Sequence, residues 1–365
     1  MSFFSFFQYC IFAILIISFP LHSQSNSCPD KGDSSSSHSG NTSSNSNNIP
    51  NENKKAKEEK EEKKNEDKED KEEKNICKKD DEVKADEESS KKEKEEKEEE
   101  EPPKIGNFSL PTSQQPAALF GFGGNIIDEG EVQLYLFEDK FFGKRKIITD
   151  VIPSVLFGIT DEWSIFFNFP FSPLMKDGKR RSSGLEDFFI QLEYAFYNKK
   201  NRCYTDQATL VANITFPTGS VRKNPPTGFG SPSLFLGGTY YHTRIDWFVF
   251  TSHGAILTAS DHRTKIGDQF LYQFGFGRNV PSPKGWIYAW MLEIDGQYNK
   301  KNRIHGKLDP NSGGNVIYIT PSIWISSKEL LVQFGVSFPV NQNLFGKQNK
   351  IDYALNFNMA WSFYK

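Results

Sequence analysis

The sequence predicts an all-β protein, a single transmembrane antiparallel β-barrel of about twelve strands preceded by a disordered charged segment. Three observations predict this fold. An export signal opens the chain, strand-like runs in its body carry apolar and aromatic residues at alternate positions, and the links between these runs alternate between short and long. This combination is typical of barrels that cross a bacterial outer membrane, which have tight turns at one end and longer loops at the other.

Residues 1–23 have the character of a secretory signal. An apolar core from Ile11 to Ile17 is followed by the polar residues His22 and Ser23. The core is too short for a comfortable membrane helix, so we expect cleavage near residue 23 rather than an uncleaved anchor, which is the alternative.

Residues 24–104 form a low-complexity tract that is rich in Ser and Asn and then, from Asn53, in Lys and Glu. Such a composition cannot bury enough apolar surface to offset the entropy lost on ordering, so it predicts a disordered spacer. The two signs of charge are interspersed, and the whole chain carries a net charge of −3. The tract is therefore not a basic arm for nucleic acid, and it does not indicate its periplasmic partner.

The body of the chain begins near residue 105 and holds all six tryptophans. We expect residues 105–129 to be either a periplasmic lead-in or a segment tucked into the lumen, and residues 130–365 to form the barrel. No run here is long enough for a membrane helix, and turn-forming Gly, Pro, Asn and Lys separate the strand-like runs.

The last run, 351–363, shows the alternation most clearly. Its first set of positions is Ile351, Tyr353, Leu355, Phe357, Met359, Trp361 and Phe363, and its second is Asp352, Ala354, Asn356, Asn358, Ala360 and Ser362. Successive side chains of a strand point to opposite faces, so one face is apolar and the other is small or polar. The run is slightly longer than the roughly 9–11 residues with which a tilted strand crosses a bilayer.

Other runs repeat this pattern, as at 286–297 and 329–338, whereas those near Leu234 and Phe248 carry aromatics on both faces. A soluble sandwich is the alternative, but so many aromatic faces would overfill a two-sheet core. In a membrane the strands must close into a barrel because hydrocarbon offers no partner for unpaired backbone groups. Arginine at Leu292 is then expected to block assembly, and arginine at Gln333 or Glu293 to be tolerated.

The links sort into two groups. We expect short ones at 160–161, 198–201, 243–244, 281–283 and 326–328, and longer ones at 173–183, 218–229, 299–313 and 341–347. In an outer-membrane barrel the short turns are periplasmic, so both ends of the barrel and the charged tract are expected in the periplasm. The expected partners are outer-membrane lipid, the barrel-assembly machinery and a small-molecule solute.

The polar faces of the strands predict a wettable, slightly acidic lumen. The lumen-facing candidates are Glu131, Gln133, Asp150, Gln191, Glu193, Gln207, Asn213, Gln273, Glu293, Asp295, Gln297 and Gln333. They would bias selectivity, although any closed barrel needs a polar interior. A barrel this narrow leaves little open bore, so we expect it to be gated or plugged.

Two motifs resemble a known family. One is Phe157-Gly158-Ile159-Thr160-Asp161-Glu162-Trp163-Ser164 with Asn168-Phe169-Pro170, and the other is Phe216-Pro217-Thr218-Gly219-Ser220 followed by Gly228-Phe229-Gly230-Ser231. From residue 105 onward the chain resembles the outer-membrane transporters of the meta-pathway of phenol degradation. The resemblance implies a barrel that moves small, aromatic or apolar molecules inward. The charged tract and the C-terminal Lys365 depart from the family pattern.

Two other classes of function remain open. A surface barrel would bind ligands through its outer loops, of which residues 176–181 are basic. An outer-membrane lipid hydrolase would need Ser and His with a polar orienting group, and Thr251-Ser252-His253-Gly254 is the nearest candidate. We expect no enzyme activity, no catalytic residues, no metal site and no cofactor, because the hydrolase motif is absent and no metal-ligand spacing occurs.

Overall fold

The computed structural model describes residues 102–260 and 264–364. The predicted signal and all but the last residues of the predicted spacer lie outside this part of the chain. Two 3-10 turns, η1 (Gly106–Phe108) and η2 (Thr112–Gln114), precede the first strand. The strands are β1 (Val132–Phe142), β2 (Lys146–Gly158), β3 (Trp163–Asn168), β4 (Phe171–Asp177), β5 (Arg180–Leu185), β6 (Phe189–Asn201), β7 (Tyr204–Thr215), β8 (Ser233–Arg244), β9 (Trp247–Thr258), β10 (Thr264–Lys265), β11 (Gln269–Val280), β12 (Trp286–Asn299), β13 (Arg303–Ile304), β14 (Lys307–Leu308), β15 (Gly314–Ser327), β16 (Leu330–Leu344) and β17 (Tyr353–Phe363).

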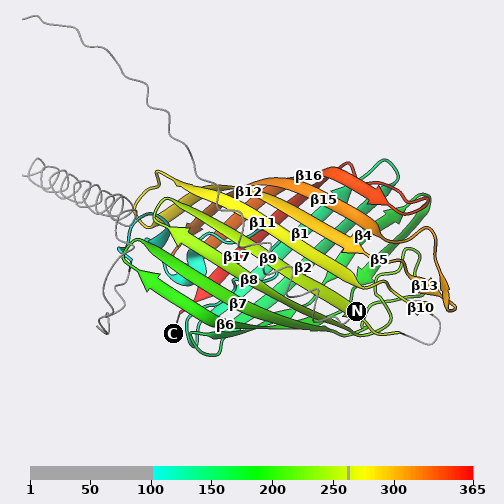
Figure 1. Ribbon diagram of the computed structural model, residues 1–365, viewed down its shortest axis with the longest axis horizontal. Helices are drawn as coiled ribbons and strands as arrows, with labels where there is room; N and C mark the ends of the chain where they lie inside the picture. The colour runs from blue at the N-terminus through cyan, green and yellow to red at the C-terminus, as the bar shows by residue number, and fades with distance from the viewer. Residues whose placement is uncertain (1–101, 261–263, 365) are drawn as a thin grey trace, which may run out of the picture. The chain divides into compact units, whose positions relative to one another are not determined.

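One antiparallel sheet closes on itself (Figure 1). Its strand order is β1-β17-β16-β15-β12-β11-β9-β8-β7-β6-β3-β2, and β1 also pairs with β2. At the closing strand, Val132 lies opposite both Phe363 and Phe157. The ring therefore has twelve positions, which confirms the predicted all-β fold of a twelve-stranded antiparallel barrel.

One position in the ring holds a broken strand. The first half of β2 pairs with β4 and its second half with β3, and Phe169-Pro170 separates these two partner strands. Proline has no N–H to give to the ladder, so pairing is interrupted there. β5 pairs only with β4, which makes a hairpin where we predicted a loop at 173–183. That prediction is wrong because its turn residues occupy only the tip of the hairpin, Gly178-Lys179.

The alternation of faces follows the sequence pattern along the strands. In β12, Leu292 is 44% exposed on the outer surface, whereas the neighbouring Glu293 is fully buried inside. In β17, Met359, Trp361 and Phe363 are exposed, and Ser362 is buried. The apolar face thus points outward, as a bilayer requires, because charged groups on the lipid face are costly.

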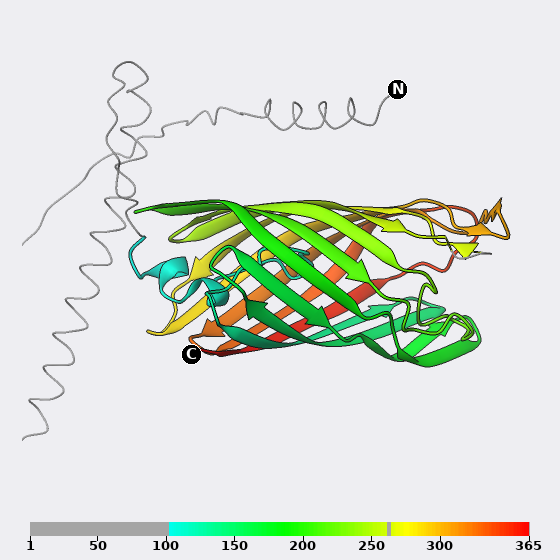
Figure 2. The same cartoon turned by 90° about the horizontal axis from the view of Figure 1, so that it is seen from below.

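The links gather at two ends of the barrel (Figure 2). We call the end with the links 159–162, 202–203, 245–246, 281–285 and 328–329 the short-turn end. The long-loop end has the links 143–145, 216–232, 259–268, 300–313 and 345–352, together with the β4–β5 hairpin. Several strands run two or more residues past the predicted breaks, because Lys and Asn beyond the bilayer still pair their backbones. The links 143–145 and 259–268 were missed.

The interior is less polar than predicted. Tyr241, Phe248, Phe250, Met291 and Trp324 form a buried apolar cluster on the inner face. Phe248 and Phe250 fit because glycines lie beside them on β11: a Cβ at Gly277 or Gly275 would overlap their rings. The runs with aromatics on both faces are therefore places where rings fill the lumen.

Candidate channel lumen

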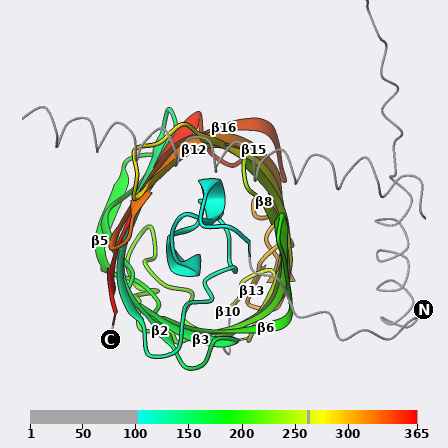
Figure 3. The same ribbon diagram turned by 90° about the vertical axis from the view of Figure 1, so that its left-hand side faces the viewer.

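Residues 105–129, which we call the plug, lie inside the barrel and fill its short-turn end (Figure 3). The plug has only the two short 3-10 turns, so its backbone polar groups need partners from the wall. Near its start, Asn107 donates its backbone N–H to Ile245 O over 2.8 Å. Gln114 donates to Ser362 Oγ over 2.6 Å and accepts from Ser326 Oγ at its carbonyl over 2.7 Å. No helix in the described part of the chain is long and apolar enough to cross a membrane.

Two wall carboxylates hold the middle of the plug. Glu293 accepts the backbone N–H of Leu119 over 2.8 Å and that of Phe120 over 3.4 Å. On the opposite side of the ring, Glu193 accepts the backbone N–H of Asn125 over 2.9 Å and its side-chain Nδ2 over 2.7 Å. Four donors of the plug thus end on two buried carboxyl groups.

Neutral side chains complete the attachment. Tyr241 accepts the N–H of Ala118 at its hydroxyl over 3.1 Å, and Gln333 donates to Ala117 O over 3.3 Å. Asn358 donates to Leu119 O over 3.3 Å. A Cβ at Gly335 would overlap the Leu119 side chain, so the glycine is what lets the plug approach β16 closely.

Beyond the plug the lumen opens into a cavity of about 820 Å³. Its floor is the plug from Ala117 to Phe122, and its walls reach Gln269 and Gln297 near the long-loop end. Tyr135 stacks on Phe137 with ring centroids 5.2 Å apart, and Phe166 packs against both rings. Phe122 of the plug packs edge-on against Phe235 at 4.6 Å. The cavity is therefore lined by nine aromatic residues together with polar side chains, the carboxyl groups of Asp139, Asp150 and Glu186 among them.

The loop 216–232 folds over the cavity. Asp187, which follows β5, accepts the N–H of Gly219 over 2.8 Å at one oxygen and that of Phe229 over 2.6 Å at the other. A Cβ at Gly219 or Gly228 would overlap this carboxylate or the facing backbone. The Pro-Thr-Gly and Gly-x-Gly-Ser motif thus supplies the residues that Asp187 binds. The loop turns inward there, and Thr227 and Phe229 line the cavity.

Ten of the twelve predicted lumen residues lie at the plug or in the open cavity, and Asp295 and Gln207 lie elsewhere on the inner face. Those buried at or under the plug are Glu131, Gln133, Glu193, Gln273 and Glu293, and those that line the open cavity are Asp150, Gln191, Asn213, Gln297 and Gln333. Asp295 accepts from Gln273 over 2.6 Å and from Thr320 over 2.9 Å, so the predicted Glu293–Asp295 pair is joined through Gln273 Nε2. Gln207 lies on the same face of β7 as the buried Thr209.

Sequence reasoning missed some cavity residues. Asp139, Glu186 and Asp187 line the cavity, and so do the rings of Tyr135, Phe137 and Phe166. For Tyr135 and Phe137 the signal is the run 132–142, where both share the odd-numbered positions with the polar residues Gln133 and Asp139.

The arrangement near His253 does not match a hydrolase. His253 and Thr251 share the outer face of β9, and their Nε2 and Oγ1 atoms lie 2.9 Å apart. Ser252 is fully buried on the inner face. Successive side chains of a strand point in opposite directions, so Ser252 and His253 cannot act as one pair. Among residues 102–260 and 264–364, no three His, Cys, Asp or Glu side chains are placed to hold a metal ion.

Neither a scan against protein-family models nor a search of curated proteins finds a match. Among solved structures, the fold is similar to that of the COG4313 outer membrane channel from Pseudomonas putida F1, with a TM-score of 0.55 and 14% identity over 68% of this chain and 99% of that one. The NanC porin and the CymD monoaromatic hydrocarbon channel align with TM-scores of 0.39 and 0.30 and identities of 8% and 12%, over 62% and 72% of this chain and 98% of each of theirs.

The likeness to the first of these structures establishes the fold class. The chain is a twelve-stranded β-barrel of the outer-membrane type. Membership of the phenol-degradation transporter family has no family match behind it and stays a prediction.

Proposed function

We propose that this protein is an outer-membrane channel that takes up small molecules, aromatic or apolar ones among them. The observation that carries the proposal is the cavity of about 820 Å³ between the plug and the inward-folded loop. Sites for small molecules are concave, mostly apolar and a few hundred to a thousand Å³ in size, with a few polar groups that orient the ligand. The three packed rings of Tyr135, Phe137 and Phe166 supply the apolar wall.

The direction of transport follows from the two ends of the barrel. Outer-membrane barrels have their short turns in the periplasm and their longer loops outside. The plug enters, and β17 ends, at the short-turn end. A solute would thus meet the loops first, rest in the cavity and leave inward when the plug moves. This orientation also sets the N-terminal charged tract in the periplasm.

A flux assay with matched solutes tests the proposal. Phenylalanine and leucine are both zwitterions that cross bare lipid slowly, and they differ chiefly in the aromatic ring. In liposomes that contain the full chain, we expect phenylalanine to enter about two- to tenfold faster than leucine, since ring stacking favours an aromatic by roughly 0.5–1.5 kcal/mol. Protein-free liposomes are the control. Equal entry of the two solutes would remove the aromatic preference, and entry of neither above the control would contradict a channel.

A further inference from the structure

A second pocket lies at the long-loop end and is strongly basic. Its volume is about 450 Å³, and it is lined by Tyr298 of β12 and by residues of the segments 265–268, 300–308 and 345. Four cationic side chains line it, those of Lys265, Lys300, Lys301 and Arg303, against the single carboxylate of Asp268. The formal charge of the pocket is thus +3, from four positive groups and one negative group.

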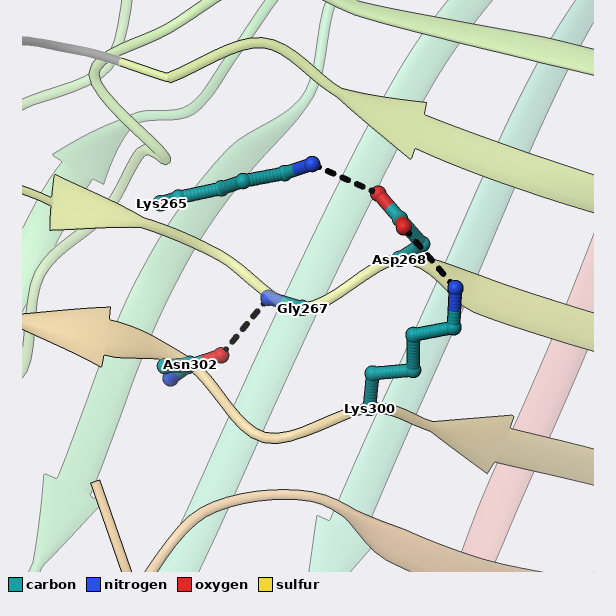
Figure 4. Close-up of polar contacts among 5 residues, drawn as sticks. All are labelled: Lys265, Gly267, Asp268, Lys300 and Asn302. Carbon is teal, nitrogen blue, oxygen red and sulfur yellow. Dashed lines mark hydrogen bonds and ion pairs between the residues drawn. The ribbon is translucent and has the colours of Figure 1, made fainter. Parts of the chain in front are cut away.

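The polar contacts set the shape of this pocket (Figure 4). Asp268 lies between two lysines, with Lys300 Nζ 3.1 Å from one carboxylate oxygen and Lys265 Nζ 3.4 Å from the other. Burial raises the pKa of Asp268, but the hydrogen bond from Lys300 and the charges of both lysines outweigh burial and hold that pKa below its ordinary value. Gly267 donates its N–H to Asn302 Oδ1 over 2.9 Å, which joins the link before β11 to the link after β12.

Two of the cations are not used in this pairing. Lys301 Nζ lies 5.2 Å from the centre of the Phe345 ring, and no ion pair joins Lys301 or Arg303 to a carboxylate within the described residues. The pocket therefore holds two lysines already neutralised in part by Asp268, and two cations whose charge is available to a ligand.

The pocket lies at the rim of the barrel, since Ile266 lines both this pocket and the lumen cavity and Tyr298 faces outward. Tyr298 lines it and is 41% exposed on the outward face of β12. The same face of β12 runs from Trp286 at the short-turn end to Tyr298, and a tilted strand of this length covers about 30 Å along the barrel axis. Aromatic girdles mark the two edges of the apolar band in such barrels. Lys300 and Lys301 follow Tyr298 by two and three residues, so we expect them just beyond the hydrocarbon.

We propose that this pocket binds a phosphate monoester, and that the source of the phosphate is a lipid head group in the leaflet at the long-loop end. A phosphate monoester carries about −1.5 to −2 charge at neutral pH and three acceptor oxygens, which suits several converging cations. Basic pockets beside membrane-spanning segments bind anionic head groups in the same way. The choice of a lipid rests on the proposed membrane position, whereas the choice of a phosphate rests on the charge of the pocket alone.

The test uses fluorescent phosphatidic acid, which has a phosphate monoester, and the full chain in neutral detergent micelles. We expect anisotropy titrations to show at least tenfold weaker binding for the Lys301→Gln/Arg303→Gln double variant than for the unchanged protein. The control variant Lys144→Gln/Arg145→Gln removes the same charges from the exposed link 143–145 at the same end and should bind as well as the unchanged protein. Heat-modifiable gel mobility shows that each variant is folded.

Inorganic phosphate distinguishes the two sources. Weak competition at millimolar concentration supports the lipid, whereas inorganic phosphate that displaces the lipid at equal concentration supports phosphate binding and overturns the lipid as its source. Equal losses of lipid affinity in the two double variants, or no loss in either, would contradict a phosphate site in this pocket. The binding assay does not depend on transport. A failure to bind phosphatidic acid therefore does not contradict the proposed channel, and an absence of solute flux does not contradict this site.

Discussion

Replacing Leu292 by arginine is expected to prevent assembly in a bilayer, whereas replacing Gln297 by arginine on the same strand should leave assembly intact. Leu292 lies on the outward face near the middle of β12, and arginine near the midplane of a bilayer costs about 2–4 kcal/mol. Gln297 lines the open cavity, where water solvates a guanidinium. The measurement is the fraction of protein with heat-modifiable gel mobility after refolding into lipid vesicles.

The choice of control follows from the plug. Glu293 and Gln333, for which the sequence predicts that arginine is tolerated, are 0% and 1% exposed and bond the plug. Arginine at either position would collide with the plug, so neither is a neutral control. Equal refolding of the Leu292→Arg and Gln297→Arg variants would contradict the assignment of the outer face to lipid.

Replacing both Glu193 and Glu293 by alanine is expected to release the plug while the barrel stays closed. The double variant leaves the buried N–H of Leu119 and the half-buried N–H groups of Phe120 and Asn125 without their acceptors. Each unsatisfied buried donor costs about 1–3 kcal/mol, and about 1.4 kcal/mol shifts an equilibrium tenfold. We therefore expect amide hydrogen exchange of residues 117–125 to become at least tenfold faster.

Exchange in the wall strands is the internal reference. The protection of β12 and β17 should change little, because their ladder bonds are not altered. The matched variant Gln297→Ala removes a lumen side chain that, among the described residues, bonds Gln269 and Asn299, and it should leave exchange in the plug unchanged. Unchanged exchange at 117–125 in the double alanine variant would show that the two carboxylates do not hold the plug.

Much of the barrel could be predicted from the sequence because a membrane barrel shows its two faces at every second residue. The outward set of β17 from Tyr353 to Phe363 follows from alternation alone. Loop ends were less predictable. Backbone pairing continues past the bilayer wherever two segments of the chain remain side by side, as in the β4–β5 hairpin. In the sequence, Lys or Gly in such a segment resembles the end of a strand.

The site was predictable only in part. Glu193 and Glu293 could be assigned to the lumen because they alternate with lipid-facing residues. Their role as acceptors for the plug could not be predicted, because it depends on backbone N–H groups of a segment about 70 to 170 residues away. The aromatic wall of the cavity was also hidden, since rings on the inner face of β1 look like rings on the outer face. Long-range contacts of these kinds leave no periodic signal.

Single-channel conductance of the full chain, compared with a variant that lacks residues 106–125, tests most directly whether this is a channel closed by its own plug. Both proteins are refolded, shown to be heat-modifiable and inserted in planar bilayers. We predict small, infrequent openings for the full chain and steady conductance several-fold larger for the deletion variant, since removal of the plug joins the cavity to the short-turn end. A folded deletion variant that conducts no more than the full chain would contradict the account.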